Sequence, residues 1–273
     1  MVKPQLAKKY EGGIDSAMYA EPKIDGLRGL IILDSHPKIV SRTGKRLLNH
    51  DHLLAPLMRN YRKAMPNGKG IVIDGEFYAG CWETTMTACR KANAAPDAVF
   101  WAFDAIPLAD FKRGRSDFDQ TVRRMFLTDI VKGVPGVKLT PQETVHSSAQ
   151  VMAAYKKWFQ KGFEGVMLKD PYAGYKGGRS PSWLKVKGAK EGDYKIIGFQ
   201  EGTGKYRGML GALFISVGGR KGKVGTGFTD EQRESFWRRQ RSLLGKWVQV
   251  GYQEKTGSGN LRFPRFVRLR LDK

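Results

Sequence analysis

The sequence contains little cysteine and little histidine. It has two cysteines, Cys81 and Cys89, and four histidines among 273 residues. Two cysteines argue against a disulfide scaffold or a zinc site, and they predict reduced thiols in a cytosolic protein. The one close histidine pair, His50 and His52, has no spaced carboxylate pattern nearby. We interpret that pair as a solvated helix start rather than a metal site.

Long apolar segments are also missing. The N-terminus has no apolar stretch of the signal-peptide kind, and no apolar run approaches the length that crosses a membrane. We therefore expect a soluble, unexported protein in the cytoplasm. The hydrophobic content of 41% and the aromatic content of 11% are those of a folded chain. The length suits one large domain or two modest domains.

Acidic residues are scarce relative to basic ones. The chain has 48 Lys+Arg against 26 Asp+Glu, which gives a formal net charge of +22. Such an excess predicts a polyanionic partner, most commonly nucleic acid, although a ribosomal or membrane-surface protein would carry the same charge. Because the basic residues are spread along the chain, they favour a folded binding surface over a disordered arm.

The hydrophobic pattern divides the chain into two parts. In the first part, apolar runs predict strands and helical periodicity predicts helices: strands over 18–20, 30–33, 71–78, 99–104, 165–169 and 183–187, and helices over 51–64, 118–131 and 147–161. Residues 188–192 have the composition of a linker. The second part has short strands split by glycines, over 194–199, 211–217, 246–252 and 266–271. A capping box at Thr229 predicts one helix there, and this pattern fits a small barrel of the OB kind.

One short segment contains a candidate nucleophile. Lys23-Ile24-Asp25-Gly26, with Arg28 beyond it, lies between two strand-like runs. A lysine amine attacks an activated phosphate only after losing its proton, and neighbouring cations favour the neutral form. The tetrapeptide alone also fits a common surface turn, so its significance depends on the motifs downstream.

Two carboxylates lie beside glycines at strand ends. Glu76 follows Asp74-Gly75, and Glu164 precedes Gly165 and an apolar strand. Each is either an edge-strand carboxylate or a ligand for a ribose hydroxyl or a metal. Two such carboxylates near phosphates suit Mg²⁺, which prefers oxygen ligands.

Cations and an aromatic ring supply further candidates. Lys185 and Lys187 share one face of a strand that is at least half buried, which favours contact with an anion such as a phosphate. Phe103 is either a core residue or a ring that stacks on a nucleobase. Three more arginines are exposed-loop or edge-strand candidates that can also grip a phosphate: Arg42, Arg179 and Arg270.

The order of these motifs resembles that of the ATP-dependent DNA ligases, within the covalent nucleotidyltransferases that include RNA ligases and mRNA capping enzymes. The segment from Glu21 to Arg28 is similar to the family's nucleophile motif. The later motifs follow in the family's order: Ser41-Arg42, Asp74 to Phe77, Phe100 to Asp104, Glu164 to Lys169, Ser182 to Lys187, Gly225 to Asp230 and Phe263 to Lys273. The resemblance covers nearly the whole chain from Glu21 onward.

The resemblance implies an α+β fold in two domains. Residues 1–188 would form a nucleotidyltransferase domain of mixed, mainly antiparallel sheets with helices, and residues 189–273 a small β-barrel OB-fold domain. Only 22 residues precede Lys23, so the match is to minimal ligases without a large N-terminal DNA-binding domain. We expect a monomer that acts on nicked duplex DNA in the cytoplasm, or in the host cytoplasm if a phage encodes it. Basic segments 205–208 and 218–223 would be flexible DNA-contacting loops.

The resemblance also implies the chemistry, which is sealing of 5′-phosphate/3′-hydroxyl nicks through a lysyl-AMP intermediate and an adenylylated DNA end. Lys23 would accept AMP from ATP, and Lys185 and Lys187 would neutralise the α-phosphate. Glu164 and Glu76 would lie near Mg²⁺ or Mn²⁺. The residues implied to bind the nucleotide are Glu21 through its backbone, Arg28, Arg42 and Glu76 at the ribose, Phe103 at the adenine, and Arg270, Asp272 and Lys273 at the leaving group.

Three leaving-group residues in the second domain imply that this domain closes over the nucleotide and later swings away. Two alternatives stay open. One is a sibling enzyme, an RNA ligase or a capping-type nucleotidyltransferase, and the other is a non-catalytic OB-containing protein that coats nucleic acid.

Overall fold

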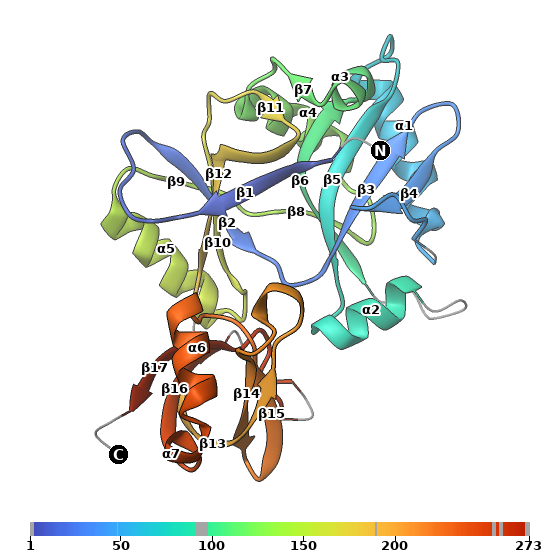
Figure 1. The fold of residues 1–273 in the computed structure, drawn as a ribbon. Coiled ribbons are helices and arrows are strands. Elements are labelled where there is room, and N and C mark those ends of the chain that lie inside the picture. The colour runs from blue at the N-terminus through green and yellow to red at the C-terminus, as the bar shows by residue number, and fades with distance from the viewer. Residues whose placement is uncertain are drawn as a thin grey trace. The chain divides into compact units, whose positions relative to one another are not determined.

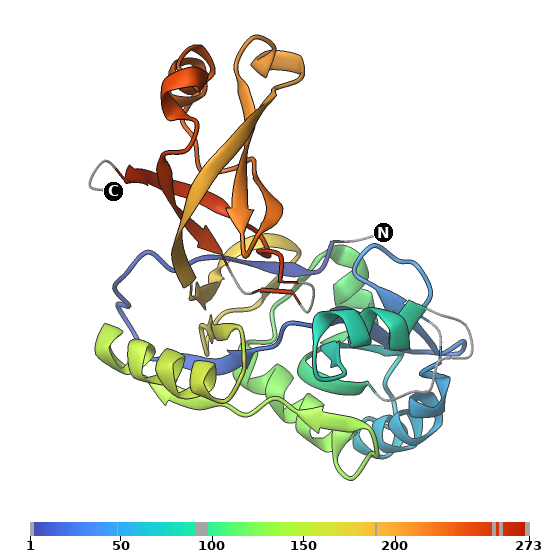
Figure 2. The same cartoon turned by 90° about the horizontal axis from the view of Figure 1, so that it is seen from below.

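The computed structural model describes residues 3–47, 49–90, 98–188, 190–252, 255–256 and 259–270. Two compact units divide the chain, Met1–Lys187 and Gly188–Lys273, and Figure 1 and Figure 2 show them from two sides. Among the helices of the described ranges, none has the length and apolar content of a membrane span.

The first unit contains two five-stranded sheets. The first sheet has the order β1-β12-β10-β2-β9. Its strands are β1 (Gln5–Lys9), β2 (Met18–Lys23), β9 (Glu143–Val145), β10 (Gly165–Lys169) and β12 (Gly178–Lys187). Helix α5 (Ser148–Gln160) lies beside this sheet (Figure 1). Its buried residues Val151, Ala154 and Trp158 share a hydrophobic core with residues of β2 and β10. One face of the sheet is therefore committed to the core.

The second sheet has the order β4-β3-β5-β6-β8. Its strands are β3 (Leu27–Leu33), β4 (Lys38–Ser41), β5 (Ile71–Tyr78), β6 (Val99–Pro107) and β8 (Val137–Leu139). The neighbouring helices are η1 (Asp51–Leu53), α1 (Leu54–Ala64), α2 (Trp82–Arg90), α3 (Leu108–Arg113) and α4 (Gln120–Val131). A two-stranded ribbon pairs β7 (Arg115–Ser116) with β11 (Tyr175–Lys176).

Side-chain caps define where two of these helices begin. The Asp119 side chain accepts a hydrogen bond from the Val122 backbone N–H at the start of α4. Ser147 accepts one from the Gln150 N–H at the start of α5. These caps satisfy backbone donors that a helix terminus leaves unpaired. They begin both helices within two residues of the predicted positions.

The second unit is a five-stranded sheet with the order β15-β14-β13-β16-β17. Its strands are β13 (Lys190–Glu201), β14 (Leu210–Val217), β15 (Arg220–Val224), β16 (Trp247–Tyr252) and β17 (Arg265–Arg270). Its helices are η2 (Gly204–Tyr206), α6 (Asp230–Arg238) and α7 (Gln240–Leu243). Thr229 and Gln232 form the predicted capping box of α6. The sheet stays open between its two edge strands in the described residues, apart from a bridge between Thr226 and Arg265.

Two predictions about the second part of the chain were wrong. The segment 188–192 is mostly strand rather than linker, because Lys190, Glu191 and Gly192 pair with β16 across the sheet. The segment 218–223 is a tight turn followed by β15 rather than a flexible loop, because residues 220–224 pair with β14. Both pairings are non-local, so the local glycine and lysine content does not reveal them.

His50 is also not a solvated helix start. Its ring is fully buried, stacks on Phe77 at a centroid distance of 4.3 Å, and lies 3.4 Å from the Cys89 Sγ through Nε2. Burial lowers the pKa of His50 to about 4, so the ring is neutral in the core. The partners that bury it lie far along the chain, on β5 and α2.

Candidate functional site

The centre of the first sheet brings two lysines to one carboxylate. Gly165, at the start of the central strand β10, pairs with Lys187 of β12 on one side and Lys23 of β2 on the other. Glu164 directly precedes β10, and its N–H donates to the Lys23 carbonyl at 2.9 Å. Its carboxylate forms ion pairs with both Lys23 and Lys187. Although burial disfavours the charged carboxylate, these two ammonium groups hold the pKa of Glu164 below its ordinary value.

Two glycines let the backbone come close enough to build this row. A Cβ on Gly165 would lie 2.0 Å from the Val186 carbonyl oxygen, and a Cβ on Gly26 would lie 1.9 Å from the Phe77 carbonyl oxygen. No side chain is tolerated at such distances, so both positions require glycine. The spacing from Lys23 to Gly26 therefore has a steric origin, since the turn after β2 lies directly against β5.

The second row of the same face is formed by Lys185, Met167 and Glu21. Burial, followed by the nearby cations of Lys187 and Arg179, lowers the pKa of Lys185. A cation held beside other cations gains stability from a bound anion, because the anion relieves the repulsion between them. This face of the sheet is therefore suited to receive negative charge.

Glu21 uses its side chain within the protein. Its buried carboxylate lies 2.8 Å from the Lys169 Nζ and accepts from the Gln142 Nε2 at 2.9 Å. The Arg124 Nη1 lies 3.4 Å away. These three donors engage the Glu21 carboxylate within the protein.

The second sheet supplies the facing wall. Arg28 of β3 pairs across the sheet with Glu76 of β5 and donates from Nε and Nη2 to the two Asp74 carboxylate oxygens, at 2.8 and 2.6 Å. Burial opposes the charge on Arg28, but the Asp74 pair outweighs it and raises the pKa of Arg28. Burial also raises the pKa of Glu76 to about 7, against the pull of Lys23 and Arg28. Glu76 is therefore able to donate or accept a hydrogen bond near neutral pH.

Phe103 lies at a β-bulge in β6. Asp74 pairs with Asp104 and Gly75 pairs with Ala102, so Phe103 is the extra residue between them. A bulge frees its residue from the ladder and redirects it, and the Phe103 carbonyl accepts from the Lys169 Nζ at 2.6 Å. The Lys169 ammonium also lies 4.9 Å from the centroid of the Phe103 ring. Through Glu21 and Phe103, this one buried lysine ties the first sheet to the second.

These two walls enclose a pocket of about 310 Å³. Its lining includes eight of the predicted site residues: Glu21, Lys23, Arg28, Arg42, Glu76, Phe103, Lys185 and Lys187. Glu164 lies beside the pocket, against two of the lining lysines. Arg179 also lines it and donates from Nη1 to the Ala7 carbonyl at 3.2 Å.

Only one of the three predicted leaving-group residues lies among the described residues. Arg270 belongs to the second unit, where its Nη1 lies 2.7 Å from the Asp193 Oδ2. Asp272 and Lys273 lie outside the described residues.

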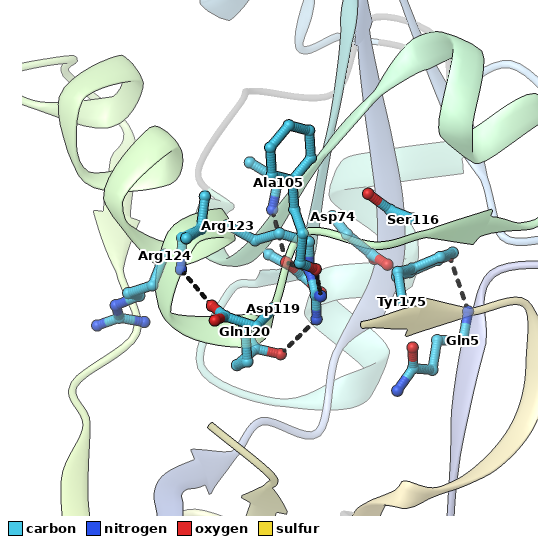
Figure 3. A network of polar contacts seen from close by, with 12 residues as sticks. Gln5, Asp74, Ala105, Ser116, Asp119, Gln120, Arg123, Arg124 and Tyr175 are labelled. Carbon is cyan, nitrogen blue, oxygen red and sulfur yellow. Dashed lines mark hydrogen bonds and ion pairs between the residues drawn. The ribbon is translucent and has the colours of Figure 1, made fainter. Parts of the chain in front are cut away.

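Several pocket residues were not predicted from the sequence. Lys169 and Trp183 line the pocket, and Asp74 holds Arg28 beneath it. For Lys169 a signal was present, because strand alternation places it on the same face as Met167 and Gly165. Beneath this layer, the buried Arg123 donates to the Asp104 Oδ1 at 2.9 Å and to the Gln120 Oε1 at 2.8 Å (Figure 3).

The pocket combines a lysine amine with a high density of other cations, an aromatic ring and a carboxyl group that titrates near neutrality. Such a set suits a nucleotide, because cations face phosphates, the ring can stack on a base, and Glu76 can meet sugar hydroxyls. No cluster of three or more His, Cys, Asp or Glu residues that could hold a metal occurs among the described residues. Any metal here would rely on one or two carboxylates and on oxygens of the substrate, as Mg²⁺ commonly does.

Family models match both units. A model described as "ATP dependent DNA ligase domain" matches residues 4–187, and one described as "DNA ligase OB-like domain" matches residues 201–270. A curated relative named DNA ligase, from Archaeoglobus fulgidus, is 32% identical over 100% of this chain and 55% of its own length. The chain thus spans about half the length of that relative.

Solved structures agree over nearly the whole chain. One named "Pmar-Lig_PreS3" has a TM-score of 0.89 and 30% identity, and the match covers 98% of this chain and 68% of that one. Another, from work on DNA binding with a minimal scaffold in the Lig E DNA ligases, has a TM-score of 0.77 and 25% identity. That match covers 99% of this chain and 100% of the other.

Proposed function

The chain belongs to the ATP-dependent DNA ligase family, and from that premise we propose that it seals nicks in duplex DNA with ATP as co-substrate. In this proposal, the unit of residues 1–187 carries out adenylation, and the unit of residues 188–273 is its OB-fold domain. The observation that carries the proposal is the row of Lys187, Glu164 and Lys23 on the wall of a pocket whose other wall presents Phe103 and Glu76.

The first step would form a covalent lysyl-AMP. The neutral amine of Lys23 attacks the α-phosphorus of ATP, a P–N bond forms, the bond to pyrophosphate breaks, and the amine loses a proton. Because phosphoryl transfer depends chiefly on positioning and charge stabilisation, Lys185 and Lys187 would contribute by holding the α-phosphate oxygens. Their placement beside Lys23 on one sheet face supports these roles.

The nucleoside would be held by the remaining wall. Phe103 would stack on adenine, the Glu21 backbone would meet the base edge, and Glu76 and Arg42 would bind the ribose. The family resemblance implied that Arg28 contacts the nucleotide directly. We propose a different part for it, because Asp74 already engages two of its nitrogens. Its part would be to hold Asp74 and the second sheet in place.

Glu164 and Glu76 offer the hard oxygen donors that Mg²⁺ or Mn²⁺ accepts, and the proposed phosphates would supply the rest. Such an ion would neutralise charge on the phosphates. Glu164 pairs with Lys23 and Lys187 in the structure. Those two lysines would be released toward the phosphates when Glu164 turns to a cation.

The second and third steps would act on DNA. AMP passes from Lys23 to the 5′-phosphate at the nick, and the 3′-hydroxyl then attacks that activated phosphate and releases AMP. Arg270, Asp272 and Lys273 would assist only the first step, at the pyrophosphate. Duplex DNA is the partner that the net charge of +22 favours.

Labelling with ATP tests the proposal. Incubation with ATP labelled at the α-phosphate and Mg²⁺ should leave label on the protein, and Lys23→Ala should abolish it, whereas the exposed-site control Lys63→Ala should label normally. Parallel reactions with GTP, NAD and nicked RNA should give no label or product. A wild-type protein that never accepts label, or a Lys23→Ala protein that does, would contradict the proposal.

A further inference from the structure

The first unit carries a small ribbon that exposes two paired cations. In the antiparallel pair of β7 and β11, Ser116 lies opposite Tyr175 and Arg115 lies opposite Lys176. Ser116 and Tyr175 are buried, whereas Arg115 and Lys176 are exposed. Like charges directly opposite each other on neighbouring strands destabilise a sheet. The folding of the ribbon therefore gains nothing from having cations at both positions.

The ribbon is nevertheless held firmly from below. The Tyr175 hydroxyl accepts from the Gln5 backbone N–H at 2.9 Å, as Figure 3 shows, and the Lys176 N–H donates to the Gln5 Oε1 at 2.7 Å. The Ser116 hydroxyl donates to the Asp110 Oδ2 at 2.6 Å. A fixed backbone reduces the entropy that is lost when its side chains order on a ligand.

Two further cations lie around the ribbon. Lys112 lies in the last turn of α3, just before the ribbon, and the Lys3 carbonyl oxygen would lie 2.8 Å from a Cβ on Gly177. Both side chains are exposed. None of the four cations Lys3, Lys112, Arg115 and Lys176 forms an ion pair with a carboxylate in the described ranges.

Of the nearby Asp110, Asp117 and Asp119, two have other partners, which leaves Asp117 as the one acidic residue of these three against the four cations. Asp110 pairs with Arg113 at 2.5 Å and accepts from Ser116, and Asp119 caps α4. Asp117 is exposed and follows Ser116 directly. The ribbon therefore presents uncompensated positive charge.

The ribbon leads into the pocket. Lys176 is followed within two residues by β12, whose Arg179 lines the pocket. Three residues span at most about 11 Å, so the exposed cations continue the positive lining of the pocket onto the surface. Lys3 likewise precedes β1, whose residues Leu6 and Ala7 also line the pocket.

We propose that Arg115 and Lys176, assisted by Lys3 and Lys112, bind the phosphate backbone of duplex DNA beside the nick. This inference rests on the proposed function of the pocket. Opposite residues of a ribbon hold their Cβ atoms about 5 Å apart, and one strand of B-DNA carries a charge for every 3.4 Å or so of its axis, so two long side chains that start side by side can each reach a phosphate of one strand. Backbone contacts carry no sequence information, which suits an enzyme that must act at any nick.

Salt dependence of binding tests the ribbon. The probe is a fluorescent nicked duplex with a 3′-dideoxy end that cannot be sealed, and anisotropy gives its Kd for the full chain at several salt concentrations. Arg115→Ala/Lys176→Ala should weaken binding by roughly 10- to 100-fold near 0.1 M salt and reduce the slope of log K against log salt by about 1 to 2, because each lost phosphate contact removes about 0.9.

A matched variant controls for net charge. Arg62→Ala/Lys63→Ala removes two exposed cations from α1 and should leave the slope and the Kd close to those of the wild type. The ribbon variant should unfold at or above the wild-type temperature, since it relieves a like-charge pair. A ribbon variant with the wild-type slope, or a control variant with an equal loss, would overturn the inference.

Two further measurements separate the inference from the proposed function. ATP should label the ribbon variant as well as it labels the wild type, because Arg115 and Lys176 do not line the pocket. A wild type that fails to label contradicts the ligase proposal. The Kd and the salt slope still test the ribbon in that case. A duplex shortened on the side of the nick that the ribbon contacts should bind wild type and ribbon variant equally. A duplex shortened on the other side should keep the difference in Kd between them. Equal sensitivity on both sides, or a preference for single strands or duplex RNA, would contradict a contact with duplex DNA beside the nick.

Discussion

The two units handle buried positive charge in different ways. In the first unit, the two fully buried cations of the described residues face carboxylates: Lys169 faces Glu21 and Arg123 faces Asp104. In the second unit, the buried Arg233 donates instead to backbone carbonyls of Leu210, Gly211 and Gly225, at 2.7 to 3.1 Å.

The ion pairs of the first unit support the pocket, whereas the hydrogen bonds of Arg233 in the second unit only hold segments of its sheet together. The paired charges of the first unit lie at and directly behind the pocket walls, since Lys169 and Glu21 line the pocket and Arg123 and Asp104 lie behind them. Arg233 joins β14 to the segment after β15 and carries no ligand-facing group with it. If the comparison is correct, breaking a pair in the first unit should disturb far more than breaking the bonds of Arg233.

The largest effect is expected for Lys169→Met. The Glu21 carboxylate and the Phe103 carbonyl would lose their shared ammonium, and removal of one partner from a buried ion pair costs about 3–5 kcal/mol. Urea denaturation measures the loss, and hydrogen exchange should localise it to β10, β2 and β6. Lys169→Arg, which keeps the charge, should recover part of it. A loss below about 1 kcal/mol would mean that the pair is not a support of the walls.

A pH-dependent effect of intermediate size is expected for Glu76→Gln. The pKa of Glu76 is raised from 4.5 to about 7 in the folded protein, so its contribution to stability is present below pH 4.5 and is lost as the pH rises toward 7. The variant removes this loss, and above pH 7 it should be more stable than the wild type by up to about 3 kcal/mol. Unfolding curves at pH 4.5 and 7.5 measure the difference, with the exposed Glu11→Gln as a control that should show none. A stability difference that does not change between these pH values would contradict the raised pKa.

The smallest effect is expected for Arg233→Met. Three carbonyl acceptors lose a charged donor, which we expect to cost about 2 kcal/mol in the second unit. Hydrogen exchange should rise in β14 and β15 and stay unchanged in β10. If exchange rises equally in the first unit, the two units do not respond separately and the comparison fails.

The sequence predicted those helices and strands that are stabilised by residues close together in the chain. The strand 71–78 matches β5, which begins with the apolar run Ile71 to Ile73, and the helices after Asp119, Ser147 and Thr229 begin at their caps. Motif order, not any single motif, predicted the family and eight lining residues of the pocket. The particular tasks of those residues remain predictions.

Features that depend on distant partners were missed or mistaken. Lys169 attracts no notice as the last residue of a strand, because Phe103 and Glu21 lie far from it in the sequence. His50 is polar by composition and becomes a core residue only through Phe77 and Cys89. In β17, a bulge leaves Val267 exposed and turns Leu269 toward the core, although simple alternation placed the two on one face.

The carboxylate of Glu164 has a consequence for the chain at rest. While it is shared between Lys23 and Lys187, the side-chain nitrogen of Lys23, the proposed nucleophile, is engaged by a partner within the protein. A reactive amine in an open, cation-rich pocket would otherwise be a target for any electrophile that carries negative charge, such as an acyl phosphate. The same pairing makes the Lys23 amine available only to a ligand that draws both Glu164 and Lys187 away from it.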